Sequence, residues 1–374
     1  MKVLHVIVGL DVGGAENMLK RLIESDVNSI SKTAVVSLTT VGAIGEILRA
    51  KNVKVHALGM TSILDLPVTL WRLIRFLRQY HPAIVQTWMY HADLIGGLAA
   101  RMTGCSVVWN VRSTAIPQGA MSVTYWLVRL CAIASSVIPD RVICCAKAAK
   151  VAHIKLGYMA RKMTVIPNGY NFTSLTSNLN LRIKARASFG FRVEDIVIGT
   201  VGRFDPLKDF HNFISAASKL SAKRNDVKYL MVGRNIDSSN ATLIGWIEDA
   251  GLTDKFLLMG EQSDIALVLS AMDIFCLSSV NEAFPNVVVE AMAMGVPCVV
   301  TRAGDAAEIL DDDEFVVPVK DSSALSDALL RLCDYSPSDR IRLGKRGAEK
   351  VREKYEINEI RTKYEKVYAE IVSK

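Results

Sequence analysis

Residues 274–295 read IFCLSSVNEAFPNVVVEAMAMG, an apolar run followed by a polar turn and a second apolar run. The first run, Ile274 to Leu277, predicts a buried strand of a parallel sheet, because it is short and has no polar face. Pro285 fixes φ at a value that suits the first turn of a helix. We therefore expect a helix over Asn286 to Met294, ended by Gly295.

Two carboxylates, Glu282 and Glu290, lie on either side of the predicted helix start, with seven residues between them. A helix N-terminus has free N–H groups and the positive end of the helix dipole, so it favours phosphate. Carboxylates do not bind phosphate, but they accept hydrogen bonds from sugar hydroxyls. The stretch therefore indicates a ligand that carries both groups, namely a nucleotide sugar.

The residues from Glu282 to Pro297 follow the pattern E-x-F-P-N-x-x-x-E-A-M-A-x-G-x-P. This pattern resembles the E-x7-E motif of the retaining glycosyltransferases of the GT4 type, among them enzymes of bacterial surface-polysaccharide and O-antigen synthesis. The resemblance covers essentially the whole chain. It implies an α/β protein of the GT-B fold, in which two Rossmann-like domains with parallel sheets face each other across a cleft.

The resemblance also implies roles for single residues. Glu282 would hold hydroxyls of the donor sugar and Glu290 those of the ribose, and the turn between them would bind the donor through Phe284, Pro285, Asn286 and Val287. One position departs from the family, which usually has Gly after the first Glu, where this chain has Ala283. If the backbone there requires a positive φ, Ala is costly, and the turn or the donor-sugar contact would differ.

The length of 374 residues suits two domains better than one core. We expect an N-terminal acceptor-binding domain over 1–170 and a C-terminal nucleotide-sugar-binding domain over 171–350. The turn at residues 165–169, Val-Ile-Pro-Asn-Gly, is the usual crossing between the domains in this family. The remainder, 351–374, is expected to return to the first domain as part of one long amphipathic ending that starts near Glu349.

Charge is distributed unevenly between the two halves. Residues 1–170 contain nineteen Lys or Arg against eight Asp or Glu, whereas the remainder contains twenty-six against thirty. A basic and apolar first half favours an anionic partner, either a membrane surface or a polyprenyl phosphate. Nucleic acid is not expected, because the chain has no helix-turn-helix, zinc-finger or RNA-binding signature.

The first half alternates strand-like and helical segments, which predicts a parallel sheet with helices on both faces. Ligands of such sheets bind beyond the carboxyl ends of the strands. Three loops in that position hold candidate residues, which are Gly13, Gly14 and Glu16 in the first, His91 in the second and Arg112 in the third. A tight strand–helix connection would also explain the two glycines, and a lone His such as His91 is usually structural.

The family resemblance adds specific expectations for these loops. The N–H groups of Gly13 and Gly14 would approach the donor pyrophosphate or the acceptor, and His91 would contact the donor sugar. Glu16 and Arg112 are expected on the acceptor side, where Arg112 could meet an acceptor phosphate.

The second half restarts the strand–helix pattern with Ile196–Val201, followed by the turn Gly202-Arg-Phe-Asp-Pro-Leu-Lys208. Arg203 and Lys208 would neutralise negative charge on a departing diphosphate, since Arg grips two oxygens and Lys supplies a mobile charge. The loop beginning at Gly260 receives the nucleotide base in the family, largely through backbone groups. The sequence therefore does not decide whether the donor carries uracil or guanine, and we favour a UDP-sugar.

Several sequence features bear on the cellular compartment of the protein and on its contact with a membrane. The seven Cys form no C-x-x-C pair, so we expect them to be small core residues of a protein that lies in a reducing compartment. The apolar run at residues 2–8 is too short for a signal peptide. Leu66 to Tyr80 predicts a helix with a basic face, which would either dock on an anionic bilayer or be solvated. Residues 120–139 hold one charge, Arg129, and read as a buried or membrane-dipping helix. We expect a cytoplasmic protein, peripheral on the inner face of the membrane.

The resulting expectation is a retaining hexosyl- or N-acetylhexosaminyltransferase that uses no cofactor and no catalytic metal, since the one Asp-x-Asp of the sequence, Asp311-Asp312-Asp313, is expected to be a solvated turn. Its acceptor is expected to be a polyprenyl-diphosphate-linked saccharide. Two alternatives remain open: a non-catalytic nucleotide-sugar-binding scaffold at the membrane, and a nucleotide-sugar epimerase on the same fold. Turnover with labelled donors and lipid-linked acceptors separates these three.

Overall fold

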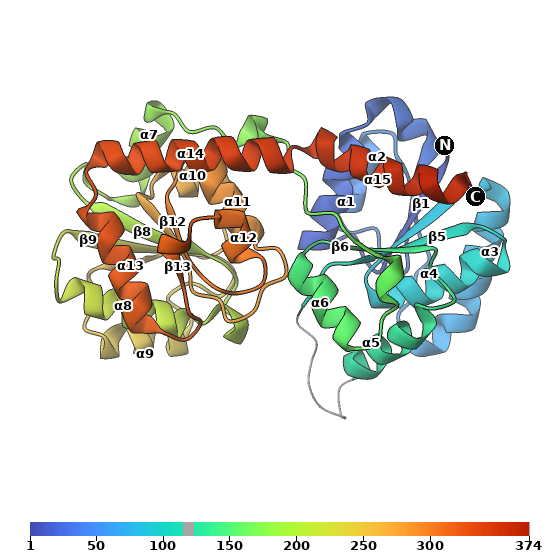
Figure 1. The fold of residues 1–374 in the computed structure, drawn as a ribbon, viewed down its shortest axis with the longest axis horizontal. Coiled ribbons are helices and arrows are strands. Elements are labelled where there is room, and N and C mark those ends of the chain that lie inside the picture. Colours follow the sequence, from blue (N-terminus) through green and yellow to red (C-terminus); the bar gives the residue numbers. More distant parts are fainter. Residues whose placement is uncertain (115–122, 374) are drawn as a thin grey trace. The chain divides into compact units, whose positions relative to one another are not determined.

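The computed structural model describes residues 1–114 and 123–373. The chain forms two compact units, of which the first comprises Met1–Tyr170 and Tyr355–Lys374 and the second Asn171–Lys354 (Figure 1). Each unit is built on one sheet in which every strand pair is parallel. The predicted α/β class with two parallel sheets is confirmed.

The sheet of the first unit has seven strands in the order β3-β2-β1-β4-β5-β6-β7. Its central strands have almost no exposed residue, as expected for a parallel sheet with both faces covered. The strands are β1 (Val3–Ile7), β2 (Thr33–Ser37), β3 (Lys54–Ala57), β4 (Ile84–Trp88), β5 (Ser106–Val111), β6 (Arg141–Cys144) and β7 (Met163–Val165).

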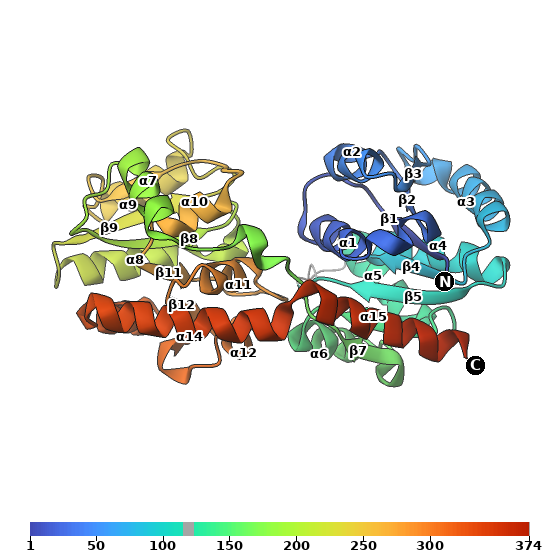
Figure 2. The ribbon, with the colours of Figure 1, turned by 90° about the horizontal axis from the view of Figure 1, so that it is seen from above.

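Helices cover both faces of this sheet (Figures 1 and 2). One face carries α1 (Gly14–Glu24), α2 (Gly42–Ala50) and α15 (Ile357–Val372), whose apolar side chains share one buried cluster with the strands. The other face carries α3 (Leu66–Tyr80), α4 (Tyr90–Met102), α5 (Val123–Ala134) and α6 (Lys147–Lys155), and α4 packs against both α3 and α5. Short 3-10 turns are η1 (Val27–Lys32), η2 (Ile63–Asp65) and η3 (Ala160–Lys162).

The amphipathic ending expected from near Glu349 consists of the end of one helix and the whole of a second, α15, which belongs to the first unit. α14 (Pro337–Tyr355) ends at an extended residue, Glu356, with φ −58° and ψ 133°. Tyr170 pairs with this residue as in a parallel sheet: its N–H donates to the Tyr355 carbonyl, and the Ile357 N–H donates to the Tyr170 carbonyl. The helix therefore breaks where another part of the chain takes its backbone groups.

The second sheet has six strands in the order β10-β9-β8-β11-β12-β13. They are β8 (Ile196–Val201), β9 (Val227–Val232), β10 (Phe256–Leu258), β11 (Ile274–Leu277), β12 (Cys298–Thr301) and β13 (Val316–Val317). Besides α14, the helices are α7 (Leu179–Phe189), α8 (Phe210–Ser221), α9 (Ala241–Asp249), α10 (Ile265–Ser270), α11 (Asn286–Ala293), α12 (Ala306–Leu310) and α13 (Ser322–Asp334), with η4 (Phe172–Ser174), η5 (Pro206–Lys208) and η6 (Asp313–Phe315).

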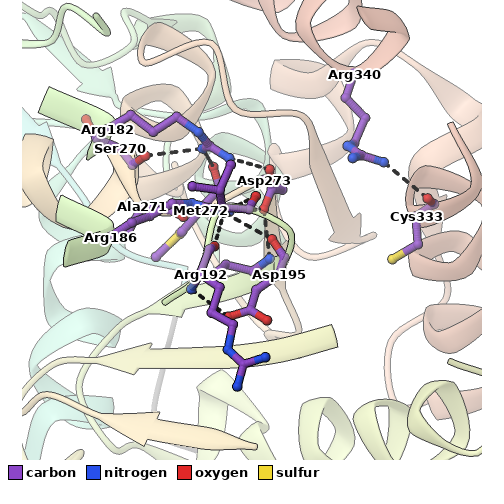
Figure 3. A network of polar contacts seen from close by, with 12 residues as sticks. Arg182, Arg186, Arg192, Asp195, Ser270, Ala271, Met272, Asp273, Cys333 and Arg340 are labelled. Carbon is purple, nitrogen blue, oxygen red and sulfur yellow. Dashed lines mark hydrogen bonds and ion pairs between the residues drawn. The ribbon is translucent and has the colours of Figure 1, made fainter. Parts of the chain in front are cut away.

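An ion-pair network fixes α7 to the amino edge of this sheet (Figure 3). Arg182 and Arg186 both pair with Asp273, the residue before β11, and donate to backbone carbonyls of residues 270–272. A cavity of about 640 Å³ lies at this edge and is lined in part by Arg182 and Arg340. Since these guanidinium groups bond backbone carbonyls or Asp273, they serve the structure of the unit.

No helix within the described ranges combines the length and the apolar character that crossing a bilayer requires. Within the apolar segment 120–139, Val123–Ala134 forms α5, residues 135–139 follow as a turn, and residues 120–122 lie outside the described part of the chain.

Candidate active site

The second unit brings two loops together where its strand order reverses. β8 lies between β9 and β11, so the segments after β8 and β11 leave the sheet as neighbours at its carboxyl edge. The Val280 N–H donates to the Leu207 carbonyl at 2.8 Å, and the Ser278 hydroxyl donates to the Lys208 carbonyl at 2.8 Å. The two loops are therefore fixed to one another before any ligand is considered.

Lys208 and Glu282, both predicted site residues, form an ion pair between these loops. Lys208 Nζ donates to Glu282 Oε1 at 2.6 Å, and the Ser279 hydroxyl donates to the same oxygen at 2.8 Å. The side chains are only 22% and 13% exposed, so their attraction is screened less than in a surface pair. A cation and a carboxylate thus meet at one point of the sheet edge.

Glycines next to this pair allow close backbone approach. A Cβ at Gly202 would lie 3.5 Å from Cδ and Cε of Lys208, an ordinary contact, so space alone does not require glycine there. Gly233, after β9, has φ 146°, and a Cβ there would lie 2.1 Å from the Gly202 carbonyl oxygen. The glycine that the β8 loop requires is thus Gly233, which the sequence analysis did not single out.

Arg203 leaves the same loop but points to Asp205. Its guanidinium donates to Asp205 Oδ2 at 2.8–2.9 Å, and its side chain is 67% exposed. Burial works to raise the pKa of Asp205, but the Leu207 N–H and the Arg203 guanidinium outweigh it and hold this pKa below its usual value. Asp205 therefore stays ionised, and its ion pair with Arg203 fixes the guanidinium within the loop that also carries Lys208.

α11 follows directly after the Glu282 loop, as predicted. Pro285 occupies the N-cap with φ −72°, and its side chain offers no acceptor for the first amides of the helix. Phe284 and Pro285 are buried, whereas Asn286, Val287 and Glu290 are half-buried along the first two turns. The second predicted carboxylate, Glu290, thus lies on the helix that begins four residues after Glu282.

The Ala283 question has a clear answer in the structure. Ala283 is not among the non-glycine residues with a positive φ, so the expected cost of Ala at this position does not arise. The close approach falls instead on Gly304, which has φ 56° and whose Cβ would lie 2.0 Å from the Glu282 carbonyl oxygen and 2.8 Å from that of Ala283.

Gly304→Ala is therefore expected to lower the stability of the second unit more than Gly251→Ala does. Both glycines have a positive φ, so each substitution incurs about 1 kcal/mol of backbone strain, but a Cβ at Gly251 meets nothing within 4 Å. Displacing the Glu282 loop should add about 1–3 kcal/mol at Gly304. Urea unfolding midpoints of the two variants measure the difference, and equal midpoints would contradict the close approach.

The remaining donor-side residue of the second unit, Gly260, lies at the end of β10 with φ 63°. Its N–H donates to the Ile236 carbonyl at 2.8 Å and its carbonyl accepts from the Gly233 N–H at 2.7 Å. It lines a cavity of about 400 Å³ together with Met259 and residues of α9. The β9 and β10 loops are therefore linked through Gly233 and Gly260.

Three groups of predicted residues belong to the first unit, also at a carboxyl sheet edge. Gly13 is the N-cap of α1 and Gly14 its first residue. The Glu16 carboxylate folds back over Gly13, where a Cβ would lie 2.2 Å from Glu16 Oε2. Burial raises the pKa of Glu16, against the lowering effect of its own backbone N–H. Glu16 thus occupies the helix end at which an anion was expected.

His91 and Arg112 follow β4 and β5. His91 lies in the first turn of α4, where partial desolvation of its ring lowers its pKa and favours the neutral form at pH 7. Arg112 donates to Asn110 Oδ1 and to the Tyr364 hydroxyl, both at 3.2 Å, and its guanidinium lies 5.5 Å from the Trp88 ring centroid. Arg112 therefore joins β5 to α15, a role that its sequence position did not reveal.

Two residues that the sequence reading left unassigned complete the geometry of the second unit. Ser279 shares Glu282 Oε1 with Lys208, and Asp205 holds Arg203. Both lie inside the loops that were singled out, but a lone Ser or Asp in a loop carries no signal of its partner. Among residues 1–114 and 123–373, no group of three or more His, Cys, Asp or Glu side chains could hold a metal ion.

Two family models match the chain, one in each half. "Glycosyltransferase Family 4" matches residues 12–173, and "Glycosyl transferases group 1" matches residues 182–350.

Curated relatives match at lower coverage. The chain is 28% identical over 269 residues to the Escherichia coli UDP-Gal:alpha-D-GlcNAc-diphosphoundecaprenol alpha-1,3-galactosyltransferase, covering 70% of this chain and 69% of that protein. It is 26% identical over 189 residues to the Bacillus anthracis N-acetyl-alpha-D-glucosaminyl L-malate synthase, where the match spans about half of each protein, 50% and 49%.

Solved structures share the fold. The crystal structure of Anabaena Alr3699/HepE in complex with UDP superposes with a TM-score of 0.87 at 20% identity, covering 99% of this chain and 100% of that one. With both halves matched by its models and the whole chain by its fold, the protein belongs to the GT4 family of glycosyltransferases and has the GT-B fold.

Proposed function

We propose that the protein transfers a sugar from a nucleoside diphosphate sugar to an acceptor with retention of anomeric configuration. The observation that carries this proposal is the pairing of Lys208 and Glu282 at 2.6 Å where the strand order of the second sheet reverses. An ammonium suits phosphate oxygens and a carboxylate suits sugar hydroxyls, so the pair fits a ligand in which these groups are adjacent.

Each residue then has a task in the reaction. Lys208 and Arg203 would neutralise the departing diphosphate, helped by the N-terminus of α11 at Asn286. Glu282 would hold hydroxyls of the donor sugar and Glu290 those of the ribose, while His91, whose neutral form is favoured at pH 7, would contact the sugar. No metal and no cofactor takes part in this scheme. UDP is the favoured nucleotide, in line with the UDP that the Anabaena structure contains and with the name of the E. coli relative.

The acceptor that we propose is a polyprenyl-diphosphate-linked saccharide of surface-polysaccharide synthesis, at the cytoplasmic face of the membrane. The first unit supports it with an excess of eleven positive charges over residues 1–170, and the E. coli relative is named for a diphosphoundecaprenol-linked acceptor. Arg112 and Glu16 would lie on the acceptor side. The transferred group is a hexose or an N-acetylhexosamine.

The test combines a panel of UDP- and GDP-sugars with a synthetic polyprenyl-diphosphate-linked monosaccharide, and NMR of the product reads the anomeric configuration. A product of the donor's own configuration, formed in the presence of a chelator, is the expected result. Donor binding without turnover across the panel would favour a scaffold. Nucleotide release with an altered free sugar and no need for acceptor would favour an epimerase.

A further inference from the structure

Exposed apolar side chains gather on one helical layer of the first unit. Of the 22 large hydrophobic residues exposed in the described parts of the chain, 11 lie on η2, α3, α4, α5 and the turn after α5. We call this surface the outer face. Its apolar members are Ile63, Leu64, Val68, Trp71, Leu98, Met102, Val123, Trp126, Leu130, Ile133 and Val137.

The exposed apolar residues of α5 form a continuous stripe. On α5, Val123, Trp126, Leu130 and Ile133 follow one another at intervals of three and four residues, which places them on one side of the helix. The opposite side of α5, with Val128, Cys131 and Ala132, is buried in the unit. Apart from Thr124 and Arg129, α5 is therefore apolar on its outer side as well as on the side that faces the core, which is unusual for a helix whose outer side meets water.

The charges of the outer face are mainly positive. α3, α4 and α5 carry five arginines, all exposed, namely Arg72, Arg75, Arg78, Arg101 and Arg129. Three acids lie on or beside the outer face: Asp93 on α4 is fully buried, Asp65 on η2 accepts hydrogen bonds from Thr61 and Ser62, and Asp140 pairs with Arg101 at 2.7 Å. The other four arginines therefore leave an excess of positive charge. Such a surface fits an anionic apolar partner, and it disfavours a second copy of the chain, whose like charges would oppose it.

The position of the outer face in the fold bears on the reaction. In a strand–helix–strand unit the helix starts near the carboxyl end of the preceding strand. The amino ends of α3 and α5, with Val68 and Val123, therefore lie at the sheet edge that carries His91 in the first turn of α4. A partner on the outer face would lie beside that edge.

We propose that the outer face is the surface by which this protein lies on an anionic lipid bilayer, with the Trp71 and Trp126 rings in the headgroup region. Indole rings favour that interface, and arginines next to them pair with lipid phosphates. This deepens the lipid-linked acceptor of the proposed function, because a polyprenyl-linked saccharide presents its sugar at such a surface. The membrane-binding proposal can nevertheless be tested by measuring vesicle binding alone, without donor or acceptor.

The five tryptophans provide a direct probe. Trp71 and Trp126 are 59% and 58% exposed, Trp88 and Trp109 are fully buried, and Trp246 is half-buried. Adding vesicles of phosphatidylglycerol and phosphatidylcholine should shift the emission to the blue, and brominated lipid should quench it. The double variant Trp71→Phe/Trp126→Phe keeps an apolar face, so it should still sediment with the vesicles while losing most of the quenching. Sedimentation without any quenching of the wild type would overturn the proposal.

Charge variants test the same surface. Trp126→Glu/Ile133→Glu should weaken sedimentation with anionic vesicles roughly tenfold or more, and Arg75→Glu/Arg78→Glu should reduce it with anionic vesicles only. Ile341→Glu on α14, where Ile341 is 70% exposed, is the matched control and should bind like the wild type. Circular dichroism and UDP-induced thermal shifts confirm that each variant is folded, and they report on donor binding independently of vesicle binding.

Three further outcomes would overturn the proposal. The wild type could fail to bind anionic vesicles while UDP still stabilises it, which would leave the donor site intact and remove the membrane role. Trp126→Glu/Ile133→Glu could sediment as the wild type does. Finally, analytical ultracentrifugation could show a dimer that this variant dissociates, which would assign the outer face to a second copy of the chain.

Discussion

Lys208→Met is expected to lower kcat for sugar transfer about a hundred- to a thousandfold. The substitution keeps the length of the side chain and removes the charge, so the diphosphate would depart without its nearest ammonium, and charge stabilisation of this kind contributes about that much in enzyme sites. Because Lys208 is largely buried and 2.6 Å from Glu282, water cannot replace it fully. Steady-state kinetics with saturating UDP-sugar and lipid-linked acceptor measure the loss.

The matched control for this variant is Lys223→Met. Lys223 belongs to the same unit and pairs with Asp327 at 3.0 Å, but both side chains are more than half exposed, so kcat should stay within about twofold of the wild type. Lys208→Arg retains the charge in another geometry and should recover part of the activity. An unchanged kcat in Lys208→Met, with unchanged folding, would remove Lys208 from the reaction.

The sequence predicted the strand, turn and helix around Glu282 almost to the residue. β11 spans the predicted Ile274–Leu277, and α11 begins at the predicted Asn286. Local chemistry decides these boundaries, since an uninterrupted apolar run, a proline and a glycine each act within a few residues. The same holds for the loop after β8, in which Gly202, Arg203 and Lys208 follow the strand as expected.

Long-range pairing is what the sequence could not supply. Lys208 and Glu282 are 74 residues apart, and Tyr364 meets Arg112 across 252 residues. The type of a side chain does not indicate which distant residue it contacts. The break at Glu356 was missed for the same reason, because an amphipathic helical pattern continues through it and only the pairing with Tyr170 interrupts the helix. β7 and β13, of three and two residues, are too short for periodicity to reveal.

The ion pair between Lys208 and Glu282 also affects how the site binds a diphosphate. The charge of Lys208 is compensated by Glu282, which also accepts a hydrogen bond from Ser279. A diphosphate must therefore compete with Glu282 for the ammonium, whereas the sugar of a complete donor gives Glu282 hydroxyls to hold in exchange. Removing the charge of Glu282 should thus increase the affinity for UDP and decrease the rate of transfer from a UDP-sugar.

Glu282→Gln is accordingly expected to tighten UDP binding about three- to tenfold while lowering kcat with a UDP-sugar about a hundredfold. Glutamine keeps the shape and still accepts from Ser279, but it no longer neutralises Lys208, so the ammonium is available to phosphate. Titration calorimetry with UDP and initial rates with donor and acceptor measure the two effects. Glu314→Gln, which alters a half-exposed acid paired with Arg331 at 3.8 Å, should change neither. If Glu282→Gln weakened UDP binding as well as turnover, Glu282 would be orienting Lys208 for the diphosphate, not competing with it.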